Sequence, residues 1–274
     1  MYEVKNKVVF ITGGAQGLGR AYGQAVLQKG AKLFFVDVNA SAGEVAEKEL
    51  KDLYGADKVR FCPLDVTDKE KYEEVFETAV SHFGCVDVMV CNAGILNEST
   101  WELMIQVNLM STVRGTKLAL EHMRKDKGGR GGRIINISSI MGLYDHNSQP
   151  IYGGTKQAVR SFTSSMAMQP NLVSSTGVEL ACLCPDATCT NLMIKLDNTK
   201  LFSLNNTEHF DYDSVKDHLV NRMMQIPTVV NAFLKLLQLQ EMNGAILLTT
   251  KTSTTFQRMS CDDQGEEFPP PTTE

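Results

Sequence analysis

The chain has 274 residues, of which 43% are hydrophobic and 22% are charged. This is enough apolar material for one large core, so we expect a single α/β domain. The formal net charge of -5 argues against nucleic acid and anionic membrane surfaces as partners and favours a small-molecule substrate.

Short apolar runs alternate with longer amphipathic stretches along the chain. Strands are expected at residues 8–12, 31–38, 59–66, 86–94, 131–139, 178–185 and 245–250, and helices at 17–29, 41–53, 68–83, 101–124, 152–168 and 227–241. Continuous apolar strands separated by helices are typical of a parallel sheet that is covered on both faces. The sequence therefore predicts a single-domain α/β fold, a Rossmann-type doubly wound parallel sheet of about seven strands with helices on both faces.

Three of the expected helices have a capping-box spacing at their start. The pairs are Ser41 with Glu44, Thr67 with Glu70, and Ser99 with Glu102. No repeat or long linker interrupts the alternation, so one domain is expected over residues 1–258. Residues 259–274 are polar and proline-rich and are expected to form a tail.

The first residues and the cysteines indicate the compartment. The apolar run from Val8 is short and is followed by glycine, so neither a signal peptide nor a membrane span is predicted. The seven cysteines are an odd number and lie mostly in strand-like runs, which favours reduced thiols in a cytoplasmic protein. No cysteine or histidine spacing fits a zinc site, so no metal is expected.

A glycine-rich turn between the first strand and the first helix is the first chemical signal. Its candidate ligand-binding residues are Thr12, Gly13, Gln16, Gly17, Leu18 and Gly19. Glycines let the backbone turn tightly and approach a pyrophosphate, whose charge the helix N-terminus stabilises. The turn predicts a dinucleotide site, although a plain connecting loop has the same glycine content.

Asp37 ends the second strand, 18 residues beyond Gly19. A carboxylate there can accept both adenosine ribose hydroxyls and would repel a 2′-phosphate. No lysine or arginine lies in the turn before Gly19 or directly after Asp37, where Val38 follows. The sequence therefore favours NAD over NADP.

Tyr152 and Lys156 lie four residues apart at the start of a helix, with Ser139 thirteen residues upstream at a strand end. The spacing puts the lysine ammonium and the phenol on one helix face. We expect the ammonium, together with the positive ring of an oxidised nicotinamide, to lower the pKa of the phenol, so that Tyr152 takes a proton while Ser139 holds the substrate oxygen. The spacing alone also describes an ordinary surface pair.

Taken together, these motifs resemble the short-chain dehydrogenase/reductase family over residues 4 to about 250. Besides the glycine-rich turn, they include Asp65-Val66, Asn92-Ala93-Gly94, Asn108, Ser139, Tyr152 and Lys156. The resemblance implies an NAD(H)-dependent oxidoreductase that transfers a hydride between the nicotinamide and a secondary alcohol or ketone. It also implies a homo-oligomer, a dimer or a tetramer.

The resemblance assigns roles to single residues. Asp65 and Val66 would frame the adenine, Asn92, Ala93 and Gly94 would lie along the cofactor, and Tyr152 and Lys156 would also contact it. Asn108 would complete a catalytic tetrad by anchoring a water that links Lys156 to solvent. A helix-kink asparagine without a part in turnover is its alternative.

One position departs from the family pattern. A Pro-Gly pair is expected after the sixth strand, but this chain has Pro185-Asp186, which adds a side chain and a negative charge beside the nicotinamide. Thr188 and Thr190 are candidates for hydrogen bonds to the cofactor, or for caps of the next helix. The altered turn also supports a second hypothesis, an NAD-binding scaffold or sensor with weak catalysis.

Residues 186–226 are expected to form a lid over the substrate. Its apolar residues include Leu192, Met193 and Tyr212, which suit a lipophilic alcohol, although about half of such side chains would pack on the core. The resemblance also implies that Gln149 contacts the substrate, with a solvent-facing loop residue as the alternative. A fatty-acid-like substrate and a steroid or terpenoid alcohol remain equally compatible with this composition.

Overall fold

The computed structural model describes residues 1–145, 149–190, 192 and 220–257. Met193, Tyr212 and the expected tail lie outside these residues. Eight strands form one sheet: β1 Val8–Thr12, β2 Lys32–Asp37, β3 Val59–Pro63, β4 Val88–Cys91, β5 Gly132–Ile137, β6 Val178–Pro185, β7 Ile246–Thr249 and β8 Thr254–Gln257. Their order is β3-β2-β1-β4-β5-β6-β7-β8.

The described helices alternate with the strands. They are α1 Gly17–Gln28, α2 Ala40–Tyr54, α3 Lys69–Phe83, α4 Trp101–Ile105, α5 Ser111–Met123, α6 Pro150–Ala167 and α10 Ile226–Leu237. Short 3-10 turns lie at η1 Glu98–Thr100, η3 Lys125–Lys127 and η4 Ile140–Gly142, and π-helical turns at η2 Gln106–Met110 and η5 Leu172–Thr176.

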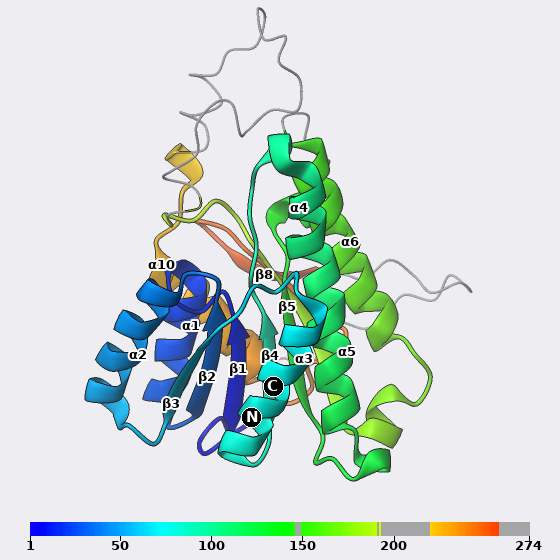
Figure 1. Cartoon of the computed structure of the whole chain (residues 1–274). Coiled ribbons are helices and arrows are strands. Elements are labelled where there is room, and N and C mark those ends of the chain that lie inside the picture. Colours follow the sequence, from blue (N-terminus) through cyan, green and yellow to red (C-terminus); the bar gives the residue numbers. More distant parts are fainter. Residues whose placement is uncertain (146–148, 191, 193–219, 258–274) are drawn as a thin grey trace, which may run out of the picture.

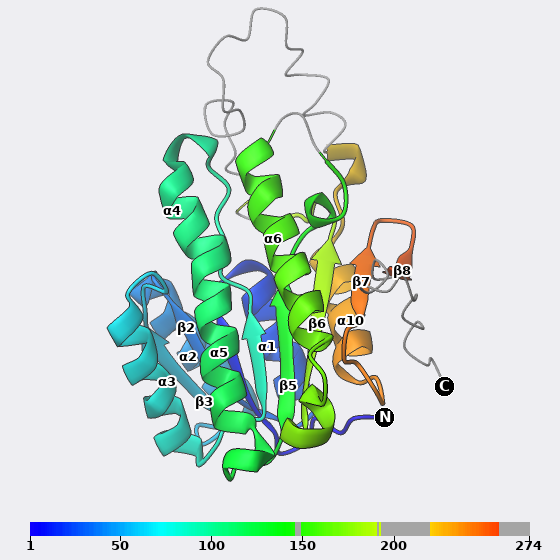
Figure 2. The same cartoon turned by 90° about the vertical axis from the view of Figure 1, so that its right-hand side faces the viewer.

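Helices cover both faces of the sheet (Figures 1 and 2). Figure 2 shows α3, α5 and α6 in front of it and α1 and α2 behind it. Successive strand residues point to opposite faces, so Val9 and Ile11 pack with α1, α2 and α10, while Val8 and Phe10 pack with α3 and α5. The predicted doubly wound sheet is confirmed.

The carboxyl ends of the parallel strands meet at one edge of the sheet. Strands β1 to β7 pair in parallel, and the chain order reverses between β1 and β4. Open α/β sheets bind ligands at such a reversal, outside the carboxyl ends of the strands. The fold therefore places the motifs that follow β1, β2, β4, β5 and β6 at a single edge.

Two expectations need correction. The eighth strand, which pairs antiparallel with β7, is absent from the sequence prediction because TTFQ is short and polar. The capping residues were also misplaced. Asn39 caps α2 by accepting from Ala42 N, Asp68 caps α3 by accepting from Lys71 N, and Asn97 caps η1 by accepting from Ser99 N.

Candidate active site

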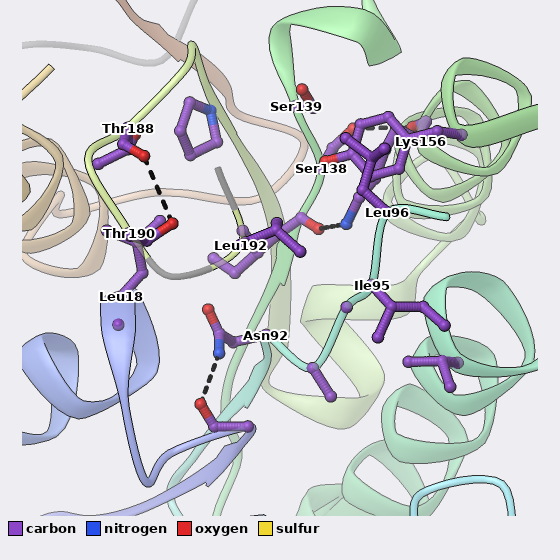
Figure 3. A pocket seen from close by; sticks show the side chains of 18 of the residues that line it. Leu18, Asn92, Ile95, Leu96, Ser138, Ser139, Lys156, Thr188, Thr190 and Leu192 are labelled. Atoms are coloured by element: carbon purple, nitrogen blue, oxygen red, sulfur yellow. Dashed lines mark hydrogen bonds between the residues drawn. The ribbon is translucent and has the colours of Figure 1, made fainter. Parts of the chain in front are cut away.

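A cavity of about 800 Å³ opens at the carboxyl edge of the sheet (Figure 3). Most predicted cofactor residues line it, together with Ser139, Tyr152, Lys156, Gln149 and Leu192. The cofactor candidates among the lining are Gly13, Gln16, Gly17, Leu18, Asp37, Val38, Asp65, Val66, Asn92, Ala93, Gly94, Pro185, Thr188 and Thr190. Thr12, Gly19 and Asn108 do not line the cavity, and they lie behind it.

The glycine-rich turn has the close packing that its glycines predicted. Gly13 and Gly17 have positive φ values of 65° and 57°, where glycine is favoured. A Cβ at Gly19 would overlap the carbonyl oxygen of Gly13. Thr12 Oγ1 accepts hydrogen bonds from the backbone amides of Asn92 and Ala93, both at 3.0 Å, so Thr12 joins the ends of β1 and β4.

Asn92 completes this junction from β4. Its Nδ2 donates to the carbonyl oxygens of Thr12 at 2.9 Å and of Gly13 at 3.1 Å. Figure 3 shows Asn92 at the floor of the cavity, below Leu192. The side chain thus holds the glycine-rich turn in shape, which the sequence did not indicate.

Asp37 lies at the far end of the cavity from Tyr152. Its Oδ2 accepts from Ala15 N at 3.1 Å and its Oδ1 from Asn39 N at 3.0 Å, so the carboxylate is fixed between the turn and the start of α2. The described lining holds two basic side chains, Lys156 beside Tyr152 and Arg222 beside Asp186. No described basic residue therefore lines the cavity at Asp37.

Tyr152 and Lys156 project from the first turns of α6. Both are buried, and Lys156 Nζ donates to the Ile137 carbonyl at 3.1 Å while lying 5.7 Å from the Tyr152 ring centroid. Ser138 Oγ donates to the Lys156 carbonyl at 2.7 Å, which ties α6 to the end of β5. The structure therefore brings Ser139, Tyr152 and Lys156 together.

The pKa of Tyr152 differs from our expectation. Burial raises it to about 12, and a hydrogen bond with the Ser139 side chain opposes that rise. Burial also lowers the pKa of Lys156 to about 8, because no described carboxylate compensates the desolvated ammonium. Within the chain itself, desolvation thus outweighs the expected effect of the ammonium on the phenol.

Asn108 is fully buried in the π-helical turn between α4 and α5. Its Oδ1 accepts from Ile95 N at 2.8 Å, and its Nδ2 donates to Ile95 O at 3.0 Å and to Thr155 Oγ1 at 3.2 Å. A Cβ on Gly94 would lie 3.5 Å from both Asn108 Oδ1 and Lys156 Nζ. Asn108 thus joins the β4 loop to α6 next to Lys156, and it also sits in a helix irregularity as the alternative reading proposed.

Sequence reasoning missed Glu98. This carboxylate is 2% exposed and accepts from the backbone amides of Ile151 at 3.2 Å and of Tyr152 at 2.8 Å. It therefore caps α6 from more than fifty residues away, whereas the N-cap residue Gln149 makes no capping bond with its side chain. No local pattern around Glu98 indicates that contact.

Apolar side chains form the wall near Tyr152. Figure 3 shows Ile95, Leu96 and Lys156 on one side of the cavity and Thr188 and Thr190 on the other. The apolar lining at this end comprises Ile95, Leu96, Leu103, Ile140, Met141 and Leu192. Gln149 is buried at the start of α6 and faces this lining, so it is not the solvent-facing loop residue that the alternative described.

The Pro185-Asp186 turn is ordered without glycine. Asp186 does not have a positive φ. Its Oδ1 accepts from Ala187 N at 2.7 Å, and its Oδ2 pairs with Arg222 Nη2 at 2.7 Å. The Thr188 hydroxyl donates to the Asp186 carbonyl at 2.8 Å, so that hydroxyl stabilises the turn.

The residues present fit a dinucleotide. Positive-φ glycines and the N-terminus of α1 provide backbone amides for phosphate at the centre of the cavity. Asp37 provides a carboxylate at one end, and the methyl of Thr190 would lie 3.7 Å from a Cβ on Gly17. The part of the chain that the structure describes contains no cluster of three potential metal ligands and no helix long and apolar enough to cross a membrane.

Comparison with known proteins agrees with these features. A family model described as short chain dehydrogenase matches residues 7–201. The chain is 37% identical to human 15-hydroxyprostaglandin dehydrogenase [NAD(+)] over 258 residues, which cover 93% of this chain and 95% of that protein. It is 34% identical over 191 residues to 3beta-hydroxysteroid dehydrogenase 2 of Eggerthella lenta, covering 66% of this chain and 71% of that protein.

A solved structure has the same fold. The crystal structure of a short chain dehydrogenase/reductase from Burkholderia phymatum in complex with NAD superposes with a TM-score of 0.75 at 22% identity, covering 90% of each chain.

Proposed function

The chain belongs to the short-chain dehydrogenase/reductase family as an NAD-dependent oxidoreductase, and we propose that it interconverts a secondary alcohol and a ketone of a lipophilic substrate. The convergence of Ser139, Tyr152 and Lys156 in the cavity that the glycine-rich turn and Asp37 also line carries this proposal. When bound, NAD supplies the acceptor of the hydride from the carbinol carbon, and its reduced form supplies the donor.

The chain's own residues handle the proton. The Ser139 hydroxyl holds the substrate oxygen by a hydrogen bond, and the Tyr152 phenol oxygen takes the hydroxyl proton during oxidation or returns it during reduction. Lys156 lies on the same face of α6 and stabilises the phenolate by its charge. Asn108, through Ile95 and Thr155, holds the loop and helix around Lys156 in place.

The apolar wall supports a lipophilic substrate. Ile95, Leu96, Met141 and Leu192 line the substrate end, where Gln149 is the neutral polar group beside Tyr152. A hydroxylated fatty-acid-like chain is favoured, because the relative with the greater coverage is 15-hydroxyprostaglandin dehydrogenase. A hydroxysteroid is the second candidate, on the likeness to the Eggerthella lenta enzyme.

A substrate panel tests the proposal. The protein is mixed with NAD and with hydroxy fatty acids, prostaglandins, hydroxysteroids or short polar alcohols, and the absorbance of reduced nicotinamide is followed. We expect turnover of the lipophilic hydroxy acids above that of the polar alcohols. If a folded sample that binds NADH turned over no substrate of the panel, the scaffold hypothesis would be favoured instead.

Tyr152→Phe is the companion variant. Loss of the phenol oxygen removes the proton acceptor while the ring still fills its place, so kcat should fall by about 10²–10⁴-fold. NADH affinity, measured by calorimetry, should change little. Unchanged turnover in this variant would remove Tyr152 from the chemistry.

A further inference from the structure

Asp186 brings a buried carboxylate into the cofactor cavity. Its side chain is 6% exposed. It lines the same cavity as Thr190 and as Gly13 and Gln16 of the glycine-rich turn. A dinucleotide carries negative phosphates, so an unpaired carboxylate at this point of the cavity would oppose its binding.

Arg222 supplies the opposite charge. Its Nε and Nη2 lie 3.1 Å and 2.7 Å from Asp186 Oδ2. Charge-assisted hydrogen bonds of this kind are strong where water is partly excluded. Besides Lys156, Arg222 is the one basic side chain among the described residues that line the cavity.

The backbone on either side keeps the pair together. Met224 N donates to Ala187 O at 2.8 Å and Cys189 N donates to Met224 O at 2.9 Å, which forms a parallel bridge between Thr188 and Met224. Residues 187–189 and 222–224 are therefore joined at the mouth of the cavity, with the ion pair next to the bridge.

We propose that Asp186 and Arg222 act as one unit in cofactor binding, in which Arg222 is required because it neutralises Asp186. Both are positioning residues, since the pair shapes the cavity end without taking part in proton transfer. The inference rests on the NAD dependence of the chain, and binding of NADH tests it without any need for a known substrate.

A double-mutant cycle in the full chain, with NADH affinity measured by calorimetry, separates charge balance from direct contact. Arg222→Met leaves the carboxylate unpaired and should weaken NADH binding by about tenfold. Asp186→Asn should bind NADH at least as tightly as the unaltered chain, because a positive charge then remains in the cavity. The combination of both changes should restore affinity to within about threefold of the unaltered chain.

Two further variants serve as controls. Arg222→Lys keeps the charge and should bind NADH better than Arg222→Met, which keeps the test valid if the methionine variant folds poorly. Lys251→Met removes a cation that donates to Asn221 O at 3.0 Å outside the cavity, and it should leave NADH affinity unchanged. Wild-type affinity in Arg222→Met, or a double variant as weak as Arg222→Met, would overturn the proposal.

Discussion

A lysine buried to the degree of Lys156 lowers stability while it is charged. Its pKa is about 8 in the folded chain and 10.5 without burial. The pKa of Lys156 is lower in the folded chain than in the unfolded chain. The contribution of Lys156 to the free energy of unfolding is therefore complete above about pH 10.5, and it is lost as the pH falls through about 8. The charge that we propose for Lys156 in catalysis therefore costs folding free energy at neutral pH.

Lys156→Met should be more stable than the unaltered chain at pH 7, and this advantage should shrink by about 1 kcal/mol between pH 7 and pH 9. Urea unfolding at both pH values measures the difference. Lys117→Met, which alters an exposed lysine on α5, serves as control and should show no such narrowing. An advantage that is constant with pH would mean that the pKa of Lys156 is not lowered in the folded chain.

Asp37 illustrates how charge and hydrogen bonding can be separated at one residue. Asp37→Asn keeps an oxygen acceptor for Ala15 N or Asn39 N but removes the negative charge. The preference for NADH over NADPH should therefore fall by about tenfold, since the repulsion of a 2′-phosphate disappears. Calorimetry with both nucleotides measures it, and Asp65→Asn, in the same cavity, should retain the preference.

At this scale, the sequence predicts residues whose spacing along the chain reflects their role. Tyr152 and Lys156 share a helix face, and Asp37 ends a strand, so the sequence alone predicted where all three residues lie. Glu98 and Arg222 could not be, because their partners lie 54 and 36 residues away and only the folded chain brings them together.

Among the elements, α6 depends on a cap that comes from another part of the chain. The four first amides of a helix have no partner within it, and Glu98 takes those of Ile151 and Tyr152. The backbone of Tyr152 is thus fixed by the loop that follows β4, the same loop in which Ile95 contacts Asn108. The orientation of α6, which carries Tyr152 and Lys156, is therefore coupled to that loop.

Glu98→Gln should lower both stability and turnover. The amide can accept from only one of the two backbone N–H groups, so about 1–3 kcal/mol of folding free energy should be lost. We expect kcat to fall more than NADH affinity, since Glu98 fixes the backbone of Tyr152 but does not itself line the cavity. Steady-state kinetics and urea unfolding together measure the two effects.

Asp68→Ala is the matched control for Glu98→Gln. Asp68 caps α3 by accepting from Lys71 N at 2.9 Å, away from the cavity. Its loss should lower stability by about 1 kcal/mol without changing kcat. If Glu98→Gln and Asp68→Ala altered turnover equally, Glu98 would have only a structural role.

The positions of the helices were predicted to within a few residues because apolar periodicity extends over many residues, but the residues that cap them were not predicted. Polar residues cluster at each start, and the sequence does not decide which one caps: Asn39 does so at α2, not Ser41. The π-helical turn at Asn108 was considered only as the alternative, a helix-kink asparagine, because nothing local distinguishes it from the surrounding helix.

Across the whole molecule, the alternation of apolar strands and helices suffices to predict the doubly wound sheet and to bring its motifs to one edge. The short β8, the pairing of Arg222 with Asp186 and the capping of α6 all depend on long-range contacts. The opposite edge of the sheet carries a buried charge network that the sequence did not indicate, centred on Arg133 at the start of β5.

Arg133 joins four parts of the chain at that edge. It donates to the carbonyls of Leu237 at 2.6 Å and Leu239 at 2.7 Å, where α10 ends, and pairs with Glu179 of β6 at 2.7 Å. Its guanidinium lies 4.0 Å from the centre of the Tyr2 ring. The Arg133 network therefore lies at the start of β5, and Ser139 of the candidate site lies just beyond its end.

Arg133→Met should therefore lower the free energy of unfolding by about 3–5 kcal/mol, because it leaves the Glu179 carboxylate and the carbonyl oxygens of Leu237, Leu239 and Gln240 without this donor. NADH affinity and kcat of the folded fraction should remain those of the unaltered chain, since Ser139 and Tyr152 lie at the opposite strand ends. Urea unfolding, calorimetry and kinetics at low temperature measure these quantities.

Arg60→Met, at a half-exposed arginine 4.0 Å from Glu47, serves as the control and should change stability by less than about 0.5 kcal/mol. A loss of NADH affinity in Arg133→Met while it remains folded would show that the two edges are coupled through the sheet.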